Sequence, residues 1–78
     1  MATILNLNGN TPNIPEDCFI APSATIVGEV LMGNECSIWF NAVIRGDVNS
    51  IKIGRCVNIQ DNVAVSYTHL TLPTIRMV

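Results

Sequence analysis

Aliphatic side chains recur at every sixth position through the first half of the chain, and this period constrains the fold more than any other feature. The row consists of Ile14, Ile20, Ile26, Met32, Ile38 and Ile44. An amphipathic helix repeats its apolar positions about every 3.6 residues and a half-buried strand about every 2, whereas a period of six is typical of a β-solenoid. The pattern therefore predicts an all-β solenoid built from hexapeptides.

A second row of small or β-branched residues follows the first row four positions later. It consists of Cys18, Ala24, Val30, Cys36, Ala42 and Val48. In a left-handed parallel β-helix each hexapeptide forms one side of a triangular prism, and three hexapeptides complete a coil. Two rows in phase predict this architecture, with each aliphatic side chain stacked on its counterpart one coil earlier.

The period slips by three residues after Ile44 and resumes at Ile53 and Ile59. We expect a three-residue insertion around Val48 to Ile51, at a prism corner where extra backbone stays solvated. The predicted stacks are Ile20, Ile38 and Ile59 on one side, Ile26 and Ile44 on the next, and Met32 and Ile53 on the third. The chain is accordingly divided into a lead-in (1–13), β-helix coils (14–64) and a tail (65–78).

The chain is short and apolar for a free-standing solenoid. It has 78 residues, of which 49% are hydrophobic and 13% charged. A short chain buries a smaller fraction of its surface than a long one, and each coil of a solenoid contacts only its neighbours. We expect other subunits to cover part of the apolar surface.

Charge and hydropathy exclude two classes of partner. The net charge is −2, and the four basic residues are dispersed along the chain as Arg45, Lys52, Arg55 and Arg76. This distribution offers no patch for a phosphate backbone, so nucleic acid is not an expected partner. No segment approaches the roughly 18 to 20 apolar residues of a membrane helix, and the N-terminal residues lack a signal-peptide pattern. A cytoplasmic protein without a membrane partner is predicted.

Cys18, Cys36 and Cys56 lack the close paired spacing of a zinc site. We interpret them as small, reduced core residues, because free cysteine often behaves as a small hydrophobe. Cys18 and Cys36 stand eighteen positions apart and are expected to stack in neighbouring coils. A disulfide or redox role is the alternative.

The segment from Ile38 to Asp61 reads IWFNAVIRGDVNSIKIGRCVNIQD. It resembles the signature of the γ-class carbonic anhydrase family of hexapeptide-repeat proteins, and the resemblance runs from about Thr11 to Val63. The combination of NAVIRGD, the three-residue slip and NIQD is more specific than the bare repeat, which O-acetyltransferases of sugars and amino acids share.

The resemblance implies a homotrimer of left-handed β-helices, each closed by a C-terminal helix that this chain lacks. It also implies a metal site between subunits, with zinc, or alternatively iron or cobalt, held by three histidines. Such a metal lowers the pKa of bound water, so that hydroxide attacks CO2 and forms bicarbonate.

Arg45, Asp47 and Gln60 correspond to functional positions of the family, and Asn58 stands beside Gln60. Arg45 and Asp47 occupy its RGD positions, which implies an ion pair at the trimer interface; the alternative is an exposed pair worth roughly 0 to 1 kcal/mol. Gly46 between them is expected to allow a tight corner. Gln60 matches the glutamine that orients metal-bound water or bicarbonate, and Asn58 on the same strand face supports it or forms an internal ladder.

Three neighbouring residues are interpreted structurally. Asp61 is expected in a turn rather than as a partner of the site. Trp39 and Phe40 are expected to form apolar surface that the trimer or a terminal segment covers, with packing in the intersubunit crevice as the alternative.

The metal ligands of the family are missing from this sequence. The position of the first histidine, six residues after Gln60, holds Ser66, and the other two ligands would lie in a later coil. His69 is the one histidine of the chain, and its spacing is wrong for the first ligand. We therefore expect the metal in the intact parent protein and no cofactor in this chain.

The six-residue period ends after Val63, since Thr71 occupies the next expected aliphatic position. VSYTHLTLPT, from Val65 to Thr74, resembles the translation of a transposase adapter used in sequencing libraries. Our hypothesis is that a coding region was cut near Ala64 and joined in silico to adapter sequence. A divergent natural tail that caps the last coil is the alternative.

Together these observations predict the N-terminal part of a γ-carbonic-anhydrase-like metalloprotein, which hydrates CO2 reversibly as an intact trimer, whereas this chain is expected to be inactive. Two alternatives remain for the parent. One is a noncatalytic metal-binding or accessory hexapeptide-repeat protein, because function resides in the site rather than in the fold. The other is a hexapeptide acyltransferase that uses acetyl-coenzyme A.

Overall fold

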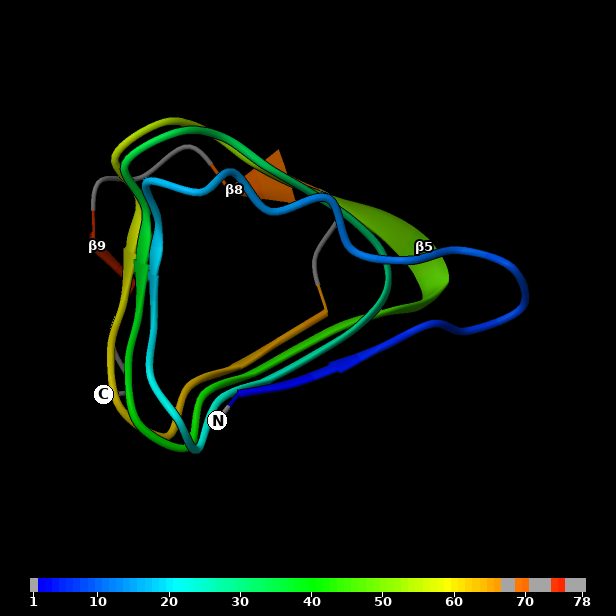
Figure 1. The fold of residues 1–78 in the computed structure, drawn as a ribbon, viewed down its shortest axis with the longest axis horizontal. Coiled ribbons are helices and arrows are strands. Elements are labelled where there is room, and N and C mark those ends of the chain that lie inside the picture. The colour runs from blue at the N-terminus through cyan, green and yellow to red at the C-terminus, as the bar shows by residue number, and fades with distance from the viewer. Residues whose placement is uncertain (1, 67–68, 71–73, 76–78) are drawn as a thin grey trace.

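The chain winds into a three-sided column of parallel strands in the computed structural model, which describes residues 2–66, 69–70 and 74–75 (Figure 1). Every strand pair is parallel, and the described residues contain no helix. The predicted all-β fold, a left-handed parallel β-helix, is confirmed. Within the described part of the chain, nothing helical is long and apolar enough to cross a bilayer.

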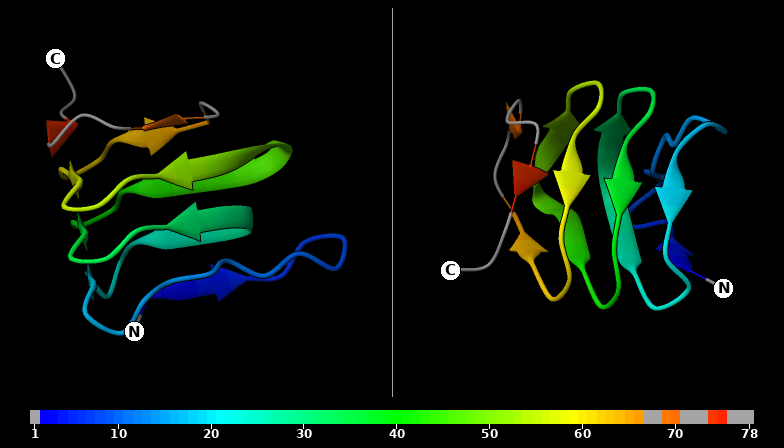
Figure 2. Two further views of the ribbon diagram at one scale, coloured as in Figure 1. Left: turned by 90° about the horizontal axis from the view of Figure 1, so that it is seen from above. Right: turned by 90° about the vertical axis from the view of Figure 1, so that its left-hand side faces the viewer.

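Most strands are short because each lies along one side of the triangle. The strands are β1 (Thr3–Leu5), β2 (Phe19–Ile20), β3 (Thr25–Met32), β4 (Ser37–Ile38), β5 (Val43–Ile53), β6 (Asn58–Ile59), β7 (Ala64–Val65), β8 (His69–Leu70) and β9 (Thr74–Ile75). The long strands β3 and β5 continue around a corner and therefore contribute to two sides. Figure 2 shows the resulting coils stacked along the column.

The three sides can be named by their strands. Wall 1 contains β1, the first halves of β3 and β5, and β7; wall 2 contains the second halves of β3 and β5, and β8. Wall 3 contains β2, β4, β6 and β9 in that order. Strands far apart in the sequence thus become neighbours, which brings residues from successive coils onto one surface.

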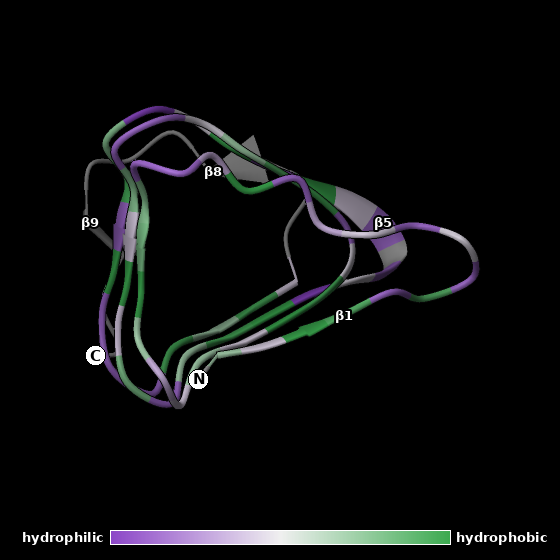
Figure 3. Cartoon of the chain, in the orientation of Figure 1, coloured by the Kyte–Doolittle hydropathy of each residue, from purple (hydrophilic) through white to green (hydrophobic). Residues whose placement is uncertain are grey.

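The predicted aliphatic stacks are confirmed. Strand register pairs Ile20 with Ile38 and Ile38 with Ile59, Ile26 with Ile44, and Met32 with Ile53. All of these except the half-buried Ile20 are buried, and four members of the small-residue row, Ala24, Val30, Cys36 and Ala42, join the same core. Burial of each large aliphatic side chain contributes about 1.5 to 3 kcal/mol. Hydrophilic segments gather mainly at the corners, as Figure 3 shows.

A three-residue insertion lies at the corner between walls 1 and 2, where β5 projects (Figure 1). The register pairs Gly28 with Gly46 and then Val30 with Ile51, so the corner of β5 has three more residues than that of β3. The insertion is confirmed, but its predicted span was wrong at one end. Ile51 is buried opposite Val30 and fills the core position assigned to Val48, whose side chain lies outside the described structure.

Gly46 pairs with Gly28 where β5 enters this corner, but it does not adopt a positive φ, so a left-handed conformation is not the reason for a glycine there. A Cβ on Gly46 would instead collide with the backbone oxygen of Glu29. The left-handed residue is its partner Gly28, with φ of 80°. A Cβ on Gly28 would lie 2.5 Å from the Gly46 oxygen. This pair of glycines allows the backbones of two coils to approach.

Cys56 does not fill the core, contrary to prediction. Cys36 is buried and Cys18 is half-buried against the core, but Cys56 is exposed at a corner with φ of 57°. The adjacent Val57 takes the inward position instead. All three cysteines are free thiols.

Both ends of the sequence pair with the coils. In the lead-in, β1 pairs with β3, so that Ile4 lies beside Ile26. After Val63, Val65 pairs with Ile44, Leu70 with Ile53 and Ile75 with Ile59. Val65 stands six residues after Ile59 and is buried, so the aliphatic row extends to Val65, and strand pairing then continues in steps of five residues. Thr71, the expected next aliphatic position, lies outside the described residues.

Candidate functional site

Asn58 and Gln60 form a hydrogen-bonded pair on the outer surface of wall 3. They flank the buried Ile59, and because successive side chains of a strand point to opposite faces, both point outward. Gln60 Nε2 donates to Asn58 Oδ1 at 2.7 Å, and both residues are half-buried. The bond orients the Gln60 carboxamide, whose Oε1 is an acceptor and whose second N–H is a donor.

Gln60 stands immediately before the corner between walls 3 and 1. The chain turns there through Asp61 and Asn62, and Asn62 has φ of 63°. Asp61 is an exposed turn residue, as predicted. The turn leads into β7, so the residues that follow Gln60 lie on the neighbouring wall.

Ser66, at the position of the expected first ligand, follows Val65 at the end of β7. Because Val65 pairs with Ile44, continuing the register by one residue sets Ser66 beside Arg45 on wall 1. Both residues are exposed. Arg45 and Ser66 thus lie together on wall 1, toward its corner with wall 2, whereas Gln60 lies on the adjoining wall 3, just before the corner with wall 1.

The described residues do not fit a metal site. No three His, Cys, Asp or Glu side chains gather among them as a ligand set. Ser66 offers a neutral hydroxyl where zinc chemistry requires a nitrogen, sulfur or carboxylate ligand. The backbone of His69 pairs with Lys52 on wall 2, whereas Gln60 is at the edge of wall 3.

Arg45 and Asp47 form a loose ion pair on either side of Gly46. Arg45 Nη1 lies 3.9 Å from Asp47 Oδ2, and the two side chains are 57% and 38% exposed. Such an exposed pair contributes roughly 0 to 1 kcal/mol to the stability of a single chain. The structure therefore places both residues at the surface, and their role at a trimer interface stays a prediction.

Three aromatic side chains cluster on wall 3 and at its corner, below the amide pair. The ring centroids of Phe19 and Trp39 are 4.9 Å apart, and those of Trp39 and Phe40 are 6.2 Å apart. Phe19 and Phe40 are each 45% exposed, whereas Trp39 is half-buried. Sequence reasoning missed Phe19, although its place one coil before Ser37 could have revealed that it lies near Trp39.

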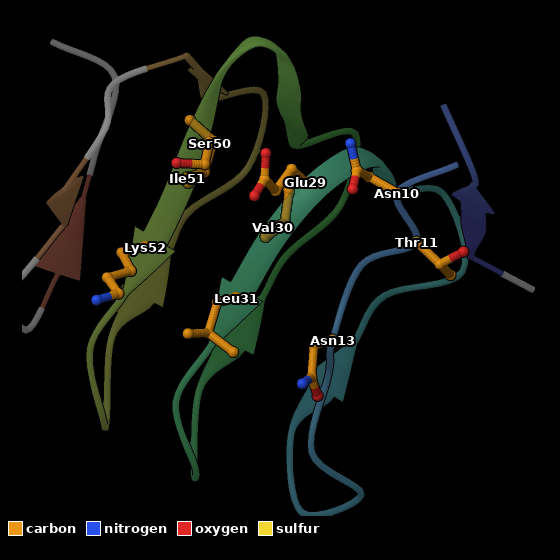
Figure 4. Close-up of a pocket in the computed structure, with 9 residues that line it drawn as sticks. All are labelled: Asn10, Thr11, Asn13, Glu29, Val30, Leu31, Ser50, Ile51 and Lys52. Carbon is orange, nitrogen blue, oxygen red and sulfur yellow. The ribbon is translucent and has the colours of Figure 1, made fainter. Parts of the chain in front are cut away.

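A separate groove of about 230 Å³ lies on wall 2 (Figure 4). Its lining residues are Asn10, Thr11, Asn13, Glu29, Val30, Leu31, Ser50, Ile51 and Lys52. Glu29 lies near the middle and Lys52 extends at one end, so the two charged groups do not converge (Figure 4). The groove contains none of the residues that the sequence singled out for function. We therefore take the corner around Gln60 as the candidate site.

Comparisons with known proteins agree with this fold and signature. No protein-family model matches the chain. The chain is 44% identical over 78 aligned residues to gamma carbonic anhydrase 2, mitochondrial, of Arabidopsis thaliana, covering 94% of this chain and 28% of that protein. It is 59% identical over 54 residues to a carbonic anhydrase of Geobacillus kaustophilus, covering 69% of this chain and 30% of that protein.

A solved structure of a proposed acetyltransferase from Bacillus cereus superposes with a TM-score of 0.79 at 48% identity, covering 81% of this chain and 37% of that one. The chain thus spans less than a third of the two carbonic anhydrases named above. The Arabidopsis relative is named a mitochondrial protein, so the cytoplasmic location stays a prediction. On its repeat, its RGD and NIQD segments and these relatives, the chain belongs to the γ-carbonic-anhydrase-like family of hexapeptide-repeat proteins.

Proposed function

We propose that these residues are the N-terminal part of a protein that hydrates CO2 reversibly, and that the Asn58–Gln60 pair orients water or bicarbonate in its site. The observation that carries the proposal is the 2.7 Å hydrogen bond between these two side chains, inside the segment that resembles the family signature. A glutamine serves this purpose because its neutral carboxamide offers both a donor and an acceptor. It can contact the hydroxyl and an oxygen of bicarbonate without adding charge.

The intact parent would hold zinc, or iron or cobalt, through ligands that the described residues do not provide. We therefore propose no catalytic step for this chain alone. In a stopped-flow CO2 hydration assay with added zinc, we expect its rate to equal that of buffer. CO2 hydration by this chain that is lost in its Gln60→Ala variant would contradict the prediction that the chain is inactive.

The proposed function is tested on the parent, expressed from the complete reading frame of the source locus. Gln60→Ala is expected to lower kcat for CO2 hydration by about 10²-fold or more, the loss seen when one preorganised donor is removed from an active site. Ser37→Ala, on the same wall one coil lower, is the control and is expected to leave kcat unchanged. An inactive parent, or a Gln60→Ala variant with full activity, would refute the proposal.

We further propose that Arg45 and Asp47 lie at the interface of a homotrimer. Arginine favours such a role because its planar fork pairs with carboxylates across interfaces. Sedimentation of the parent is expected to give a trimer, and Arg45→Ala is expected to weaken it. Arg55→Ala removes a guanidinium that is 73% exposed on another corner and serves as the control. Equal trimer stability in the two variants would exclude the interface role.

An acyltransferase is the second candidate, because the chain is 48% identical over the matched residues to the proposed acetyltransferase of B. cereus. Coenzyme A binding to the parent, measured by calorimetry and competed by acetyl-coenzyme A, would favour this candidate. A parent that binds metal but shows no CO2 hydration and no coenzyme A binding would favour an accessory protein.

Residues 65–78 are proposed to derive from adapter sequence rather than from the gene. The resemblance of VSYTHLTLPT supports this origin, whereas the pairing of Val65 with Ile44 and of β8 and β9 with the coils favours a natural tail. Resequencing the source locus with a different library chemistry decides between them. A histidine codon at position 66 is expected, and an unchanged SYTHLTLPT segment would refute the adapter origin.

A further inference from the structure

We propose that Trp39 is a positioning residue for Gln60, holding the carboxamide in one orientation from the coil below. The inference rests on the proposed function only in its consequence, because the orientation of Gln60 can be measured without any activity. Trp39 has no assigned role in the site. The sequence predicted only that it forms apolar surface covered by the trimer or a terminal segment.

Strand register makes Trp39 and Gln60 neighbours across two coils. Ile38 pairs with Ile59, and Trp39 N donates to Ile59 O at 2.9 Å, so that the next residue in each coil is Trp39 below and Gln60 above. Adjacent parallel strands lie about 4.8 Å apart, which brings the side chains of such neighbours into contact range. Along the strand, the neighbour of Gln60 on the same face is Asn58. Gln60 is thus bordered along its strand by its hydrogen-bonding partner Asn58, and the residue directly below it in the register is Trp39.

The indole is itself held in place by its surroundings. Phe19 packs against it with centroids 4.9 Å apart, and Phe40 lies at 6.2 Å. Ala21, the position on wall 3 one coil below Trp39, is fully buried although it alternates with the inward Ile20. The burial of Ala21 is explained if the aromatic cluster lies over it, and Trp39, which is half-buried, is the member of the cluster one coil below Gln60.

A second restraint on Gln60 has a physical purpose. A glutamine side chain loses rotamer entropy when it is fixed, and this loss is among the largest of any side chain. The net contribution of a single neutral hydrogen bond is modest, so the bond to Asn58 at best balances that loss. Contact with a rigid indole limits the rotamers of the Gln60 stem and shields the hydrogen bond from water on one side. The orientation of the amide is then set before a ligand arrives.

The test measures hydrogen exchange of the Gln60 side-chain amide by ¹⁵N NMR in the full chain. Trp39→Ala is expected to accelerate exchange about tenfold, whereas Trp39→Phe, which keeps an aromatic ring, is expected to change it by less than about twofold. Leu31→Ala is the matched control, since it removes an apolar side chain that is 47% exposed on wall 2. Unchanged Gln60 exchange in Trp39→Ala, with backbone protection of β5 retained, would overturn the inference.

A second variant keeps the test decisive if Trp39→Ala does not fold. Phe19→Ala removes the ring that supports the indole from below, and we expect it to accelerate Gln60 exchange about threefold. No acceleration in folded Phe19→Ala would then refute the inference. Loss of hydration activity in the parent's Gln60→Ala variant, together with unchanged Gln60 exchange in Trp39→Ala, would leave the proposed function standing and this inference refuted.

Discussion

The paired glycines Gly28 and Gly46 let two coils approach closely, and replacing Gly28 with alanine is expected to destabilise the chain strongly. Two costs add at this position. An L-residue at φ of 80° costs about 1 to 2 kcal/mol, and a Cβ 2.5 Å from the Gly46 oxygen forces a shift of packed backbone that costs about 1 to 3 kcal/mol. Alanine restricts the unfolded chain and returns about 0.4 to 1 kcal/mol. The net loss is about 3 kcal/mol.

Two other glycines allow the backbone cost and the steric cost to be measured separately. Gly9 has φ of 85° but no atom within 4 Å of an added Cβ, so Gly9→Ala is expected to lose only about 1 kcal/mol. Gly46 has no positive φ but would collide with the Glu29 oxygen, so Gly46→Ala has only the steric cost of about 1 to 3 kcal/mol, less the same return of about 0.4 to 1 kcal/mol.

The assay is urea unfolding followed by far-ultraviolet circular dichroism, with the free energy of unfolding obtained by linear extrapolation. A chain of this length has a total stability of about 4 to 12 kcal/mol, so the loss in Gly28→Ala is a large share. If Gly28→Ala lost no more stability than Gly9→Ala, the close approach of the two coils would not be rigid and the reasoning would fail. A variant that is already unfolded without urea gives no transition, and for such a variant the soluble yield is compared instead.

Two further predictions concern the core. Ile38→Ala leaves a cavity between Ile20 and Ile59 and is expected to lower the free energy of unfolding by about 2 to 5 kcal/mol. Leu31→Ala, at the exposed surface, should change it by less than about 0.5 kcal/mol. Comparable losses in the two variants would contradict the inward stacking. Burial, with a smaller effect from neighbouring Cys18, raises the pKa of the Cys36 thiol. The folded chain therefore holds this proton to higher pH than the unfolded chain, so the stabilisation is complete below the ordinary thiol pKa of about 8.5 and is lost as pH rises toward the raised value. Cys36→Ala should flatten this decline in urea unfolding between about pH 8 and 10, and an unchanged slope would contradict it.

Much of the fold was predictable because the column repeats its own geometry. In a solenoid, each inward position meets the same position of the next coil, so the spacing of Ile20, Ile38 and Ile59 along the chain encodes their contact in space. The same logic located the three-residue insertion from the slip between Ile44 and Ile53. The pairing of Asn58 with Gln60 also followed, since two residues of one strand separated by a single buried residue share a face.

The sequence by itself therefore determined the β-helix, its aliphatic stacks and the family to which the chain belongs, because all three depend on residue identity at fixed intervals. Only the tertiary structure decided that Ile51 fills the core beside Val30, that Cys56 faces solvent, and that Gly28 and Gly46 let two coils approach closely. It also brought Trp39 beneath Gln60. Ile51 and Cys56 lie where an insertion or a turn breaks the period. At such places the space between coils decides which side chain points inward, and the interval along the chain does not.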